Sequence, residues 1–428
     1  MRIRDWDKNL KIRLFGEGIM NITFWMFFPF LTIYFSEEFG KEKAGLLLVL
    51  SQLFSVLANL FGGYSADRFG RKKMMVISAF AQGIAFIGFA FANSPWLTSP
   101  WIGFICFSAV GFFGSLYWPA SQAMVADIVD EKDRSNVFAI FYTSINIAVV
   151  LGPILGAIFY VHYRFELLLA AGLISMTLAF ILSKWTRETF LAKKAVVDYE
   201  NQKWYDFLLH QIKDYKIISL DKTFFLFIVA GILSAQIFMQ LDLLIPVYSK
   251  EVIDQQIVFS FGDWEMKVNG EQGFGLLLSE NGLLVALLTV FVTKWMNKYN
   301  QRNVFISSSL MYAIAIFLFG QSEWIWSLIV AMAIFTMGEL MVAGIQQTFI
   351  SQLAPEDMRG KYFAAASLRY TIGRTIAPLS IPMTVWLGYQ WTFIILTVIA
   401  IISAVLYGYM FHLFEKNGAS NLSSQKLP

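Results

Sequence analysis

The sequence 61-FGGYSADRFGRKK-73 joins two apolar segments that are each long enough to cross a lipid bilayer. Gly62 and Gly63 allow helices to approach closely, and Gly70 allows a tight reversal of the chain. An acid, Asp67, lies at the membrane edge among four bases, Arg68, Arg71, Lys72 and Lys73. An ordinary basic loop on one side of a membrane explains the cations, but it explains neither the spaced glycines nor the acid.

The composition is that of a protein solvated mostly by lipid. Of 428 residues, 57% are hydrophobic and only 15% are charged, whereas soluble proteins carry about 25% charged residues. The net charge of +3 and the absence of a basic, aromatic-rich tract predict no nucleic-acid partner. The single cysteine, Cys106, excludes an internal disulfide, and no metal site is expected.

The hydrophobic pattern predicts an all-α integral membrane protein with twelve spans, the first of which is retained rather than cleaved as a signal. The predicted spans are 13–35, 43–65, 74–93, 101–126, 136–160, 165–186, 222–249, 275–296, 303–321, 325–352, 361–386 and 390–414. Most Lys and Arg residues outside these spans fall on one side, which predicts that both termini are cytoplasmic and that the location is the cell membrane.

The chain is predicted to consist of two six-helix halves, 1–186 and 222–414, followed by a cytoplasmic tail, 415–428. The linker 187–221 contains apolar residues at helical spacing and is expected to form an amphipathic helix on the inner membrane surface. Phe291–Asn303 is a degenerate repeat of Phe61–Lys73, as in duplicated transporters.

Between spans seven and eight, Val258–Phe261 and Trp264–Val268 flank Gly262-Asp263 and predict a small outer β-hairpin. This hairpin, within 255–272, is either a structural cap or a binding module.

Ionisable residues inside a membrane span are functional candidates because they are costly to bury. Glu339 in span ten either pairs permanently with Arg369 or Arg374 or carries protons across the membrane. Asp242 in span seven has the same proton-carrying role, unless it lies near enough to the outer surface to stay solvated. Glu17 in span one, Arg369 and Arg374 are expected to be charge partners.

The segment Phe61–Lys73 resembles the helix 2–3 loop of the major facilitator superfamily, whose pattern is roughly G-x-x-x-D-R-x-G-R-[KR]-[KR]. The matching residues are Gly63, Asp67, Arg68, Gly70, Arg71, Lys72 and Lys73. The resemblance implies that Gly63, Asp67, Arg68, Gly70 and Arg71 form a conformational latch. Alternatively, Asp67 and Asp127 merely neutralise nearby arginines.

Gly152, Pro153 and Gly156 in span five match the G-P-x-x-G element of the drug/proton antiporters in this superfamily, although a tightly packed kinked helix would need the same residues. Together with DKNLKIRL at the start, MQLD-x-x-x-P in span seven and GEL in span ten, the chain resembles the LmrP-type multidrug transporters. That resemblance places the proton-coupling acids at Asp67, Asp127, Asp242 and Glu339. Phe141 stands where this family has a span-five aspartate.

A cavity rich in aromatic and amide side chains is expected between the halves, and its predicted lining would suit flat lipophilic cations. The predicted substrate-binding residues are Asn21, Trp25, Tyr117, Trp118, Tyr142, Asn146, Gln236, Met239, Gln240, Glu339 and Gln346.

These patterns predict a proton-coupled multidrug efflux antiporter, not an enzyme, that works by alternating access. Its expected partners are small amphipathic drugs or dyes, protons and membrane lipids; its state is a monomer, and it uses the proton gradient rather than a cofactor. The alternatives are a proton-coupled exporter of one metabolite, sugar or peptide, a lipid-moving protein of the same fold, and a non-transporting receptor.

Overall fold

The computed structural model describes residues 3–160, 162–189, 220–262, 264–343, 345–353, 362 and 365–424. The chain divides into two compact units, Met1–Phe207 and Leu208–Pro428, called the N-terminal and C-terminal units below. Their boundary falls inside the predicted linker, and the amphipathic helix predicted there lies outside the described residues.

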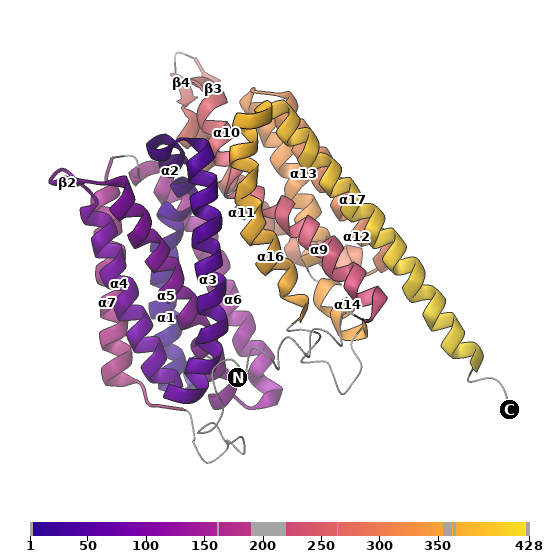
Figure 1. Ribbon diagram of the computed structural model, residues 1–428, viewed down its shortest axis with the longest axis horizontal. Helices are drawn as coiled ribbons and strands as arrows, with labels where there is room; N and C mark the ends of the chain where they lie inside the picture. The colour runs from indigo at the N-terminus through magenta and orange to yellow at the C-terminus, as the bar shows by residue number, and fades with distance from the viewer. Residues whose placement is uncertain are drawn as a thin grey trace. The chain divides into compact units, whose positions relative to one another are not determined.

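The N-terminal unit is a bundle of helices (Figure 1). Its elements are η1 (Ile3–Asp5), α1 (Lys8–Phe27), η2 (Phe28–Phe30), α2 (Leu31–Phe39), α3 (Lys41–Phe69), α4 (Arg71–Phe91), β1 (Asn93–Ser94), β2 (Leu97–Thr98), α5 (Pro100–Ile128), α6 (Glu131–Phe159) and α7 (Arg164–Trp185). Pro29 lies in η2, where the missing backbone N–H interrupts the first span between α1 and α2. Gly70 ends α3 with a φ of 99°, a conformation that residues with a Cβ rarely adopt.

The C-terminal unit is also mostly helical, but more of its helices are broken. Its elements are α9 (Lys222–Phe238), η4 (Met239–Leu241), α10 (Leu244–Val252), β3 (Gln256–Phe261), β4 (Trp264–Val268), α11 (Gly270–Met296), α12 (Gln301–Gln321), α13 (Ile325–Ala343), α14 (Ile345–Leu353), α16 (Leu368–Ile376), η6 (Ala377–Leu379) and α17 (Ser380–Ser424).

The two units repeat one packing order, which supports the predicted duplication. In the N-terminal unit, α1 packs on α6 and α7, α4 packs on α5 and α7, and α3 packs on α5. In the C-terminal unit, α9 packs on α16 and α17, α12 packs on α13 and α17, and α11 packs on α13. The helices α1, α3, α4, α5, α6 and α7 thus have counterparts in α9, α11, α12, α13, α16 and α17.

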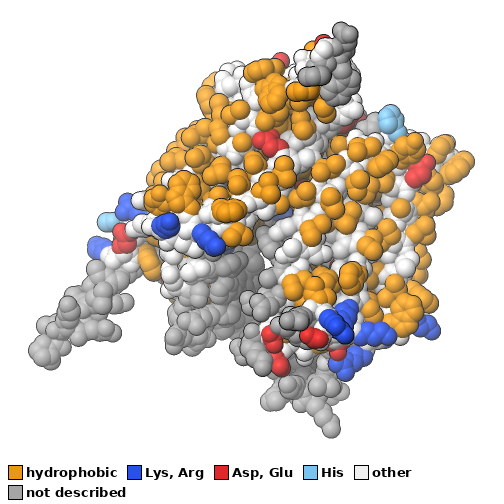
Figure 2. All heavy atoms as spheres, turned by 180° about the vertical axis from the view of Figure 1, so that it is seen from behind, with side chains coloured by type: hydrophobic (Ala, Val, Ile, Leu, Met, Phe, Trp, Pro, Cys, Tyr) orange, Lys and Arg blue, Asp and Glu red, His pale blue; other side chains and the backbone are white. Residues whose placement is uncertain are grey.

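Length and hydropathy make the described helices suitable for a membrane. Ten helical segments are long and apolar enough to cross one, and Thr143–Phe159 adds a shorter apolar helix. Figure 2 shows hydrophobic side chains over most of the visible surface of these helices. The segment Leu368–Lys416 has 49 residues, or about 74 Å of helix, which exceeds twice the roughly 30 Å core of a bilayer. Because Gly388 (φ 80°, ψ 165°) breaks the helix there, the segment accommodates both spans predicted in this region.

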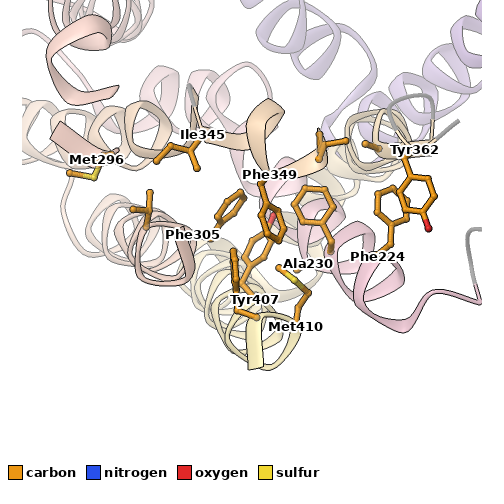
Figure 3. Packing of buried hydrophobic residues seen from close by; sticks show 14 of the residues in the cluster. Phe224, Ala230, Met296, Phe305, Ile345, Phe349, Tyr362, Tyr407 and Met410 are labelled. Carbon is orange, nitrogen blue, oxygen red and sulfur yellow. The ribbon is translucent and has the colours of Figure 1, made fainter. Parts of the chain in front are cut away.

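The core of the C-terminal unit is aromatic (Figure 3). The ring centroids of Phe349 and Phe411 are 4.7 Å apart, and those of Phe305 and Tyr407 are 5.0 Å apart. Since lipid tails are as apolar as these side chains, close ring packing rather than escape from water holds such helices together.

The predicted hairpin is present as the antiparallel pair β3–β4, and β3 starts two residues earlier than the sequence suggested. The Gln256 side chain ties it to the connection between α12 and α13, donating to the Glu323 carbonyl at 2.8 Å and accepting from the Ile325 N–H at 2.8 Å. This attachment fits a structural cap, while its position on the outer side of the membrane stays a prediction. A second, unpredicted hairpin joins β1 and β2.

Candidate functional site

Spans seven and eleven of the C-terminal unit are both broken, and the two breaks contact each other. The first break is η4, the second is η6, and Gln240 joins them. The Gln240 amide donates to the carbonyls of Gln236 (3.0 Å) and Ala377 (3.3 Å) and accepts from the Ser380 hydroxyl (2.6 Å). Gln240 is fully buried. Its amide thus satisfies backbone groups that the breaks release, which favours a structural part for this predicted substrate-binding residue.

Asp242 terminates η4, between the two half-helices of span seven. It is half-buried, and both Arg374 on α16 and Glu339 on α13 are close enough to act on it electrostatically. Asp242 therefore lies in a discontinuous membrane helix beside one cation and one further acid. Discontinuous helices of this kind form ion and substrate sites in transporters.

Glu339 is half-buried on α13, and Oε2 of its carboxylate accepts a hydrogen bond from Nδ2 of Asn281 on α11 at 3.1 Å. The same Asn281 amide donates to the Thr336 hydroxyl at 3.0 Å. Within the described parts of the chain, no ion pair joins Glu339 to either Arg369 or Arg374. The alternative of a permanent ion pair is therefore not what the structure contains.

The two arginines of span eleven have different surroundings. Arg369 is buried: its guanidinium lies 4.3 Å from the centre of the Phe227 ring, and its Nε donates to the Ala366 carbonyl. Gly231 makes room for it, since a Cβ there would come within 2.1 Å of the Arg369 Cδ. Arg374 is exposed and interacts electrostatically with Asp242. Arg374 thus belongs with Asp242, whereas Arg369 belongs with the aromatic core.

In the N-terminal unit, the Glu17 carboxylate accepts hydrogen bonds from three side chains. Its Oε1 accepts from the Arg13 Nε (2.7 Å), the Tyr117 hydroxyl (2.7 Å) and the Ser121 hydroxyl (3.2 Å). Arg13 is fully buried, and its guanidinium also lies 4.9 Å from the centre of the Phe141 ring. The charge partner of Glu17 is therefore Arg13, which the sequence prediction missed although it precedes Glu17 by one helical turn.

Gly70 and Arg71 of the predicted latch lie in a close contact of three chain segments. Arg71 Nε donates to Asp127 Oδ2 on α5 at 3.2 Å. The Glu188 carboxylate, just after α7, accepts from the backbone N–H groups of Arg71 (2.9 Å) and Lys72 (3.1 Å) at the start of α4. A Cβ at Gly70 would meet this carboxylate at 2.5 Å. The sequence missed Glu188, which lies in the predicted linker and caps α4.

The other residues of the Phe61–Lys73 segment make fewer contacts with the neighbouring helices. Arg68 donates to the Tyr64 hydroxyl at 2.7 Å. A Cβ at Gly63 would meet nothing within 4 Å, whereas one at Gly62 would come within 3.1 Å of the Leu116 backbone, so Gly62 serves the close helix contact. The side chain of Asp67 lies outside the described residues.

The G-P-x-x-G element lies where α6 crosses α1. A Cβ at Gly152 would come within 2.4 Å of the Trp25 Cβ, and one at Gly156 within 2.1 Å of the Met26 carbonyl oxygen. Pro153 lies inside α6. The two glycines therefore allow the backbones of spans one and five to touch.

The remaining predicted lining residues divide between the units. Asn21, Trp25 and Asn146 are half-buried, Tyr117 is buried, and Trp118 is 46% exposed. In the C-terminal unit, Gln236 is buried, Met239 is half-buried, and Gln346 accepts from the Tyr370 hydroxyl at 3.0 Å. The side chain of Tyr142 lies outside the described residues. A shared cavity stays a prediction.

The sequence reasoning also missed Glu280, an acid inside α11 that the rule applied to Glu339 and Asp242 would have found. Its Oε2 is buried and has no hydrogen-bond partner in the described structure. No group of metal-ligating side chains was found among the described residues.

Comparisons with known proteins agree on the family. The major facilitator superfamily model matches residues 14–264 and 257–426. A protein of Planococcus maritimus named Na(+), Li(+), K(+)/H(+) antiporter is 58% identical over 424 residues, covering 99% of this chain and 100% of that protein. Multidrug resistance protein MdtH of Baumannia cicadellinicola subsp. Homalodisca coagulata is 23% identical, covering 82% of this chain and 79% of that protein.

Among solved structures, a POT family transporter in complex with 5-aminolevulinic acid superposes with a TM-score of 0.74 at 16% identity. The match covers 93% of this chain and 94% of the transporter. This likeness shows the fold alone. Together with the match of the family model over most of the chain, these findings mean that this multi-pass membrane protein belongs to the major facilitator superfamily and is a transporter, not an enzyme.

Proposed function

We propose that this transporter exchanges the monovalent cations Na⁺, Li⁺ and K⁺ for protons, with Asp242 and Glu339 as its exchange site. The observation that carries this proposal is the 58% identity, along the whole chain, to a protein named as an antiporter of these ions. Asp242 and Glu339 in the C-terminal unit supply the carboxylates that would bind a cation or a proton.

The charge of the site favours competition between a cation and a proton. With both acids ionised, Asp242, Glu339 and Arg374 have a formal charge of −1. One proton or one monovalent cation brings this charge to zero, whereas binding both would leave an excess positive charge in the membrane. Two ligands that compete for one site and reach it from opposite sides in alternation are exchanged for each other.

The break in span seven supports ion binding at Asp242. Turns of η4 and α10 leave weaker backbone hydrogen bonds here, with Asp242 N–H to Met239 carbonyl and Leu243 N–H to Gln240 carbonyl both at 3.3 Å. Backbone carbonyl oxygens at such helix breaks, together with carboxylates, are ligands that transporters use for Na⁺. The Asn281 amide keeps the Glu339 carboxylate in a fixed orientation.

We place the end of the N-terminal unit that contains Gly70 and Arg71 in the cytoplasm of a plasma-membrane protein, because positively charged loops stay on that side. We assign the Arg71–Asp127 pair to a latch that holds one state of the alternating cycle. Asp67 belongs to the same proposed latch.

Everted membrane vesicles test the exchange. A proton gradient is formed, and an acridine dye then reports its collapse on addition of NaCl, LiCl or KCl, with choline chloride as the control. We expect the wild type to collapse the gradient and Asp242→Asn and Glu339→Gln not to. A wild type that responds no more than empty vesicles would overturn the proposal.

The second candidate is proton-coupled drug efflux, which the LmrP resemblance and the MdtH relatives favour. The same vesicles distinguish drug efflux from cation exchange when a cationic dye is added in place of the salts. Collapse of the proton gradient by the dye but by none of the salts would favour drug transport. Collapse by the dye and by the salts would mean that the site accepts organic and inorganic cations.

A further inference from the structure

Glu280 is an acid within helix α11 of the C-terminal unit. It comes ten residues after Gly270, the first residue of the 27-residue helix α11, and so about 15 Å along the helix axis. The side chain is half-buried, and Oε2 is buried without a hydrogen-bond partner among the described residues. Leu283, Leu287 and Val290 continue the same side of α11 as an exposed apolar stripe.

The elements packed against α11 provide no cation for this acid. These elements are α13, α10 and β4. Their charged groups are Glu339 on α13, Lys250 and Glu251 on α10, and Glu265 and Lys267 on β4. Lys250 pairs with Glu271 at the start of α11, and Lys267 pairs with Glu265 at 2.9 Å. Among the described residues, no ion pair joins Glu280 to a lysine or an arginine.

A carboxylate without a cation or a donor is costly inside a membrane, so Glu280 is stable there mainly as the neutral acid. Its neighbour in sequence, Asn281, lies about 100° further around the helix axis and donates a hydrogen bond to Glu339. Helix α11 therefore donates a hydrogen bond through Asn281 to the acid on α13, whereas its own acid, Glu280, has no such donor among the described residues.

We propose that Glu280 is a second proton-binding carboxyl, which carries one proton per transport cycle in addition to the proton exchanged at Asp242 and Glu339. This inference rests on the proposed cation/proton exchange. On one side of the membrane the carboxyl O–H bond breaks and the proton passes to water. The carboxylate then takes a proton from water on the other side after the protein changes state.

The extra proton has a measurable electrical consequence. Exchange of one proton for one cation at the Asp242–Glu339 pair moves no net charge. A further proton on Glu280 makes each cycle move one net positive charge. Replacing Glu280 by Gln keeps the shape of the side chain but removes this proton, so the exchange should continue without net charge movement.

Purified protein in liposomes on a solid-supported membrane tests this prediction. A jump in Na⁺ concentration should give a transient current with the wild type, while a pH dye trapped in the liposomes reports proton movement. We expect Glu280→Gln to reduce the current at least about tenfold and to keep a dye signal from the one proton per cycle that the Asp242–Glu339 pair still exchanges. Glu280→Asp, which retains a carboxyl, should keep both, and Glu271→Gln is the matched control on the same helix. A Glu280→Gln protein with wild-type current would overturn the inference.

If a jump in Na⁺ concentration moves no protons with the wild type, the proposed function is refuted. The protonation of Glu280 can then be measured directly, without transport. Infrared spectra of the purified protein between about pH 5 and about pH 9 should then contain a titrating carboxyl band that Glu280→Gln removes. Identical spectra for the two proteins would show that Glu280 does not exchange its proton.

Discussion

The two units place acids in their membrane helices in opposite ways. Glu17 in the N-terminal unit accepts hydrogen bonds from an arginine and two hydroxyls, and Arg13 beside it is fully buried. Glu339 in the C-terminal unit accepts from one neutral amide, and Arg374, which interacts electrostatically with the other site acid, Asp242, is exposed.

On the proposed function, this difference separates structural acids from acids that exchange protons. A carboxylate paired with a buried guanidinium cannot take up a proton without leaving that cation unpaired, which is costly in a low-dielectric interior. A carboxylate held by an amide loses much less when it is neutralised. Position inside a membrane span is thus a weaker indicator of proton transport than the type of group that donates to the acid.

The largest expected effect on stability comes from breaking the buried Arg13–Glu17 ion pair. Arg13→Met should lower the free energy of unfolding by about 3–5 kcal/mol, because Glu17 would remain buried without its cation. Chemical or thermal unfolding in detergent measures the change. The double variant Arg13→Met/Glu17→Leu should recover part of the loss, and a single variant as stable as the wild type would contradict the contrast between the units.

The next effect concerns the exchangeable acid. Glu339→Gln should reduce cation/proton exchange about a hundredfold, or about 2.7 kcal/mol in barrier height, and change the free energy of unfolding by less than about 1 kcal/mol. Vesicle assays and unfolding curves give the two values. Glu17→Gln is the control, since this variant should lose stability. Wild-type exchange by Glu339→Gln would remove Glu339 from the mechanism.

A smaller effect should follow from removing the amide donor. Asn281→Ala deprives the charged form of Glu339 of one hydrogen bond, so competition at this site shifts toward the proton. The apparent affinity for Na⁺ near neutral pH should fall about tenfold, equal to about 1.4 kcal/mol, and recover as the pH rises. Thr336→Val removes the other acceptor of the Asn281 amide and should leave this pH dependence unchanged. An equal loss of affinity at every pH would argue against the proposed role.

The smallest effect is expected at an acid outside the membrane. Glu188 is exposed and caps α4, so Glu188→Gln should lower the free energy of unfolding by only about 0.3–1 kcal/mol, through the lost attraction to the helix dipole. Added salt should shrink the difference between the two proteins. A loss of stability as large as that of Arg13→Met would mean that exposure does not explain why Glu17 and Glu188 differ in their effect on stability.

Much of the architecture could be predicted because it depends on local patterns. Runs of apolar residues predicted the helical spans, Gly70 predicted the reversal between α3 and α4, and the hairpin followed from Gly262 between two short strands. The general rule about acids in membrane spans found Asp242 and Glu339, and applied without omission it would have found Glu280.

The missed groups depend on contacts between distant residues. Glu188 binds the start of α4 from 117 residues away, and Gln240 reaches the Ala377 carbonyl from 137 residues away. Nothing local to RETF or to FMQLD identifies such partners. The Arg13–Glu17 pair was visible as two residues one turn apart, but only the fold shows that Tyr117 and Ser121 enclose it.

The joined breaks at η4 and η6 have a consequence for isotope exchange. Amide hydrogens inside a continuous membrane helix exchange with deuterium very slowly, because each is bonded and shielded from water. The Asp242 and Leu243 N–H groups instead make three-residue turns at 3.3 Å. Away from the ends of span seven, deuterium should therefore enter first at these two amides, which makes them a native reporter of how far water reaches into the protein.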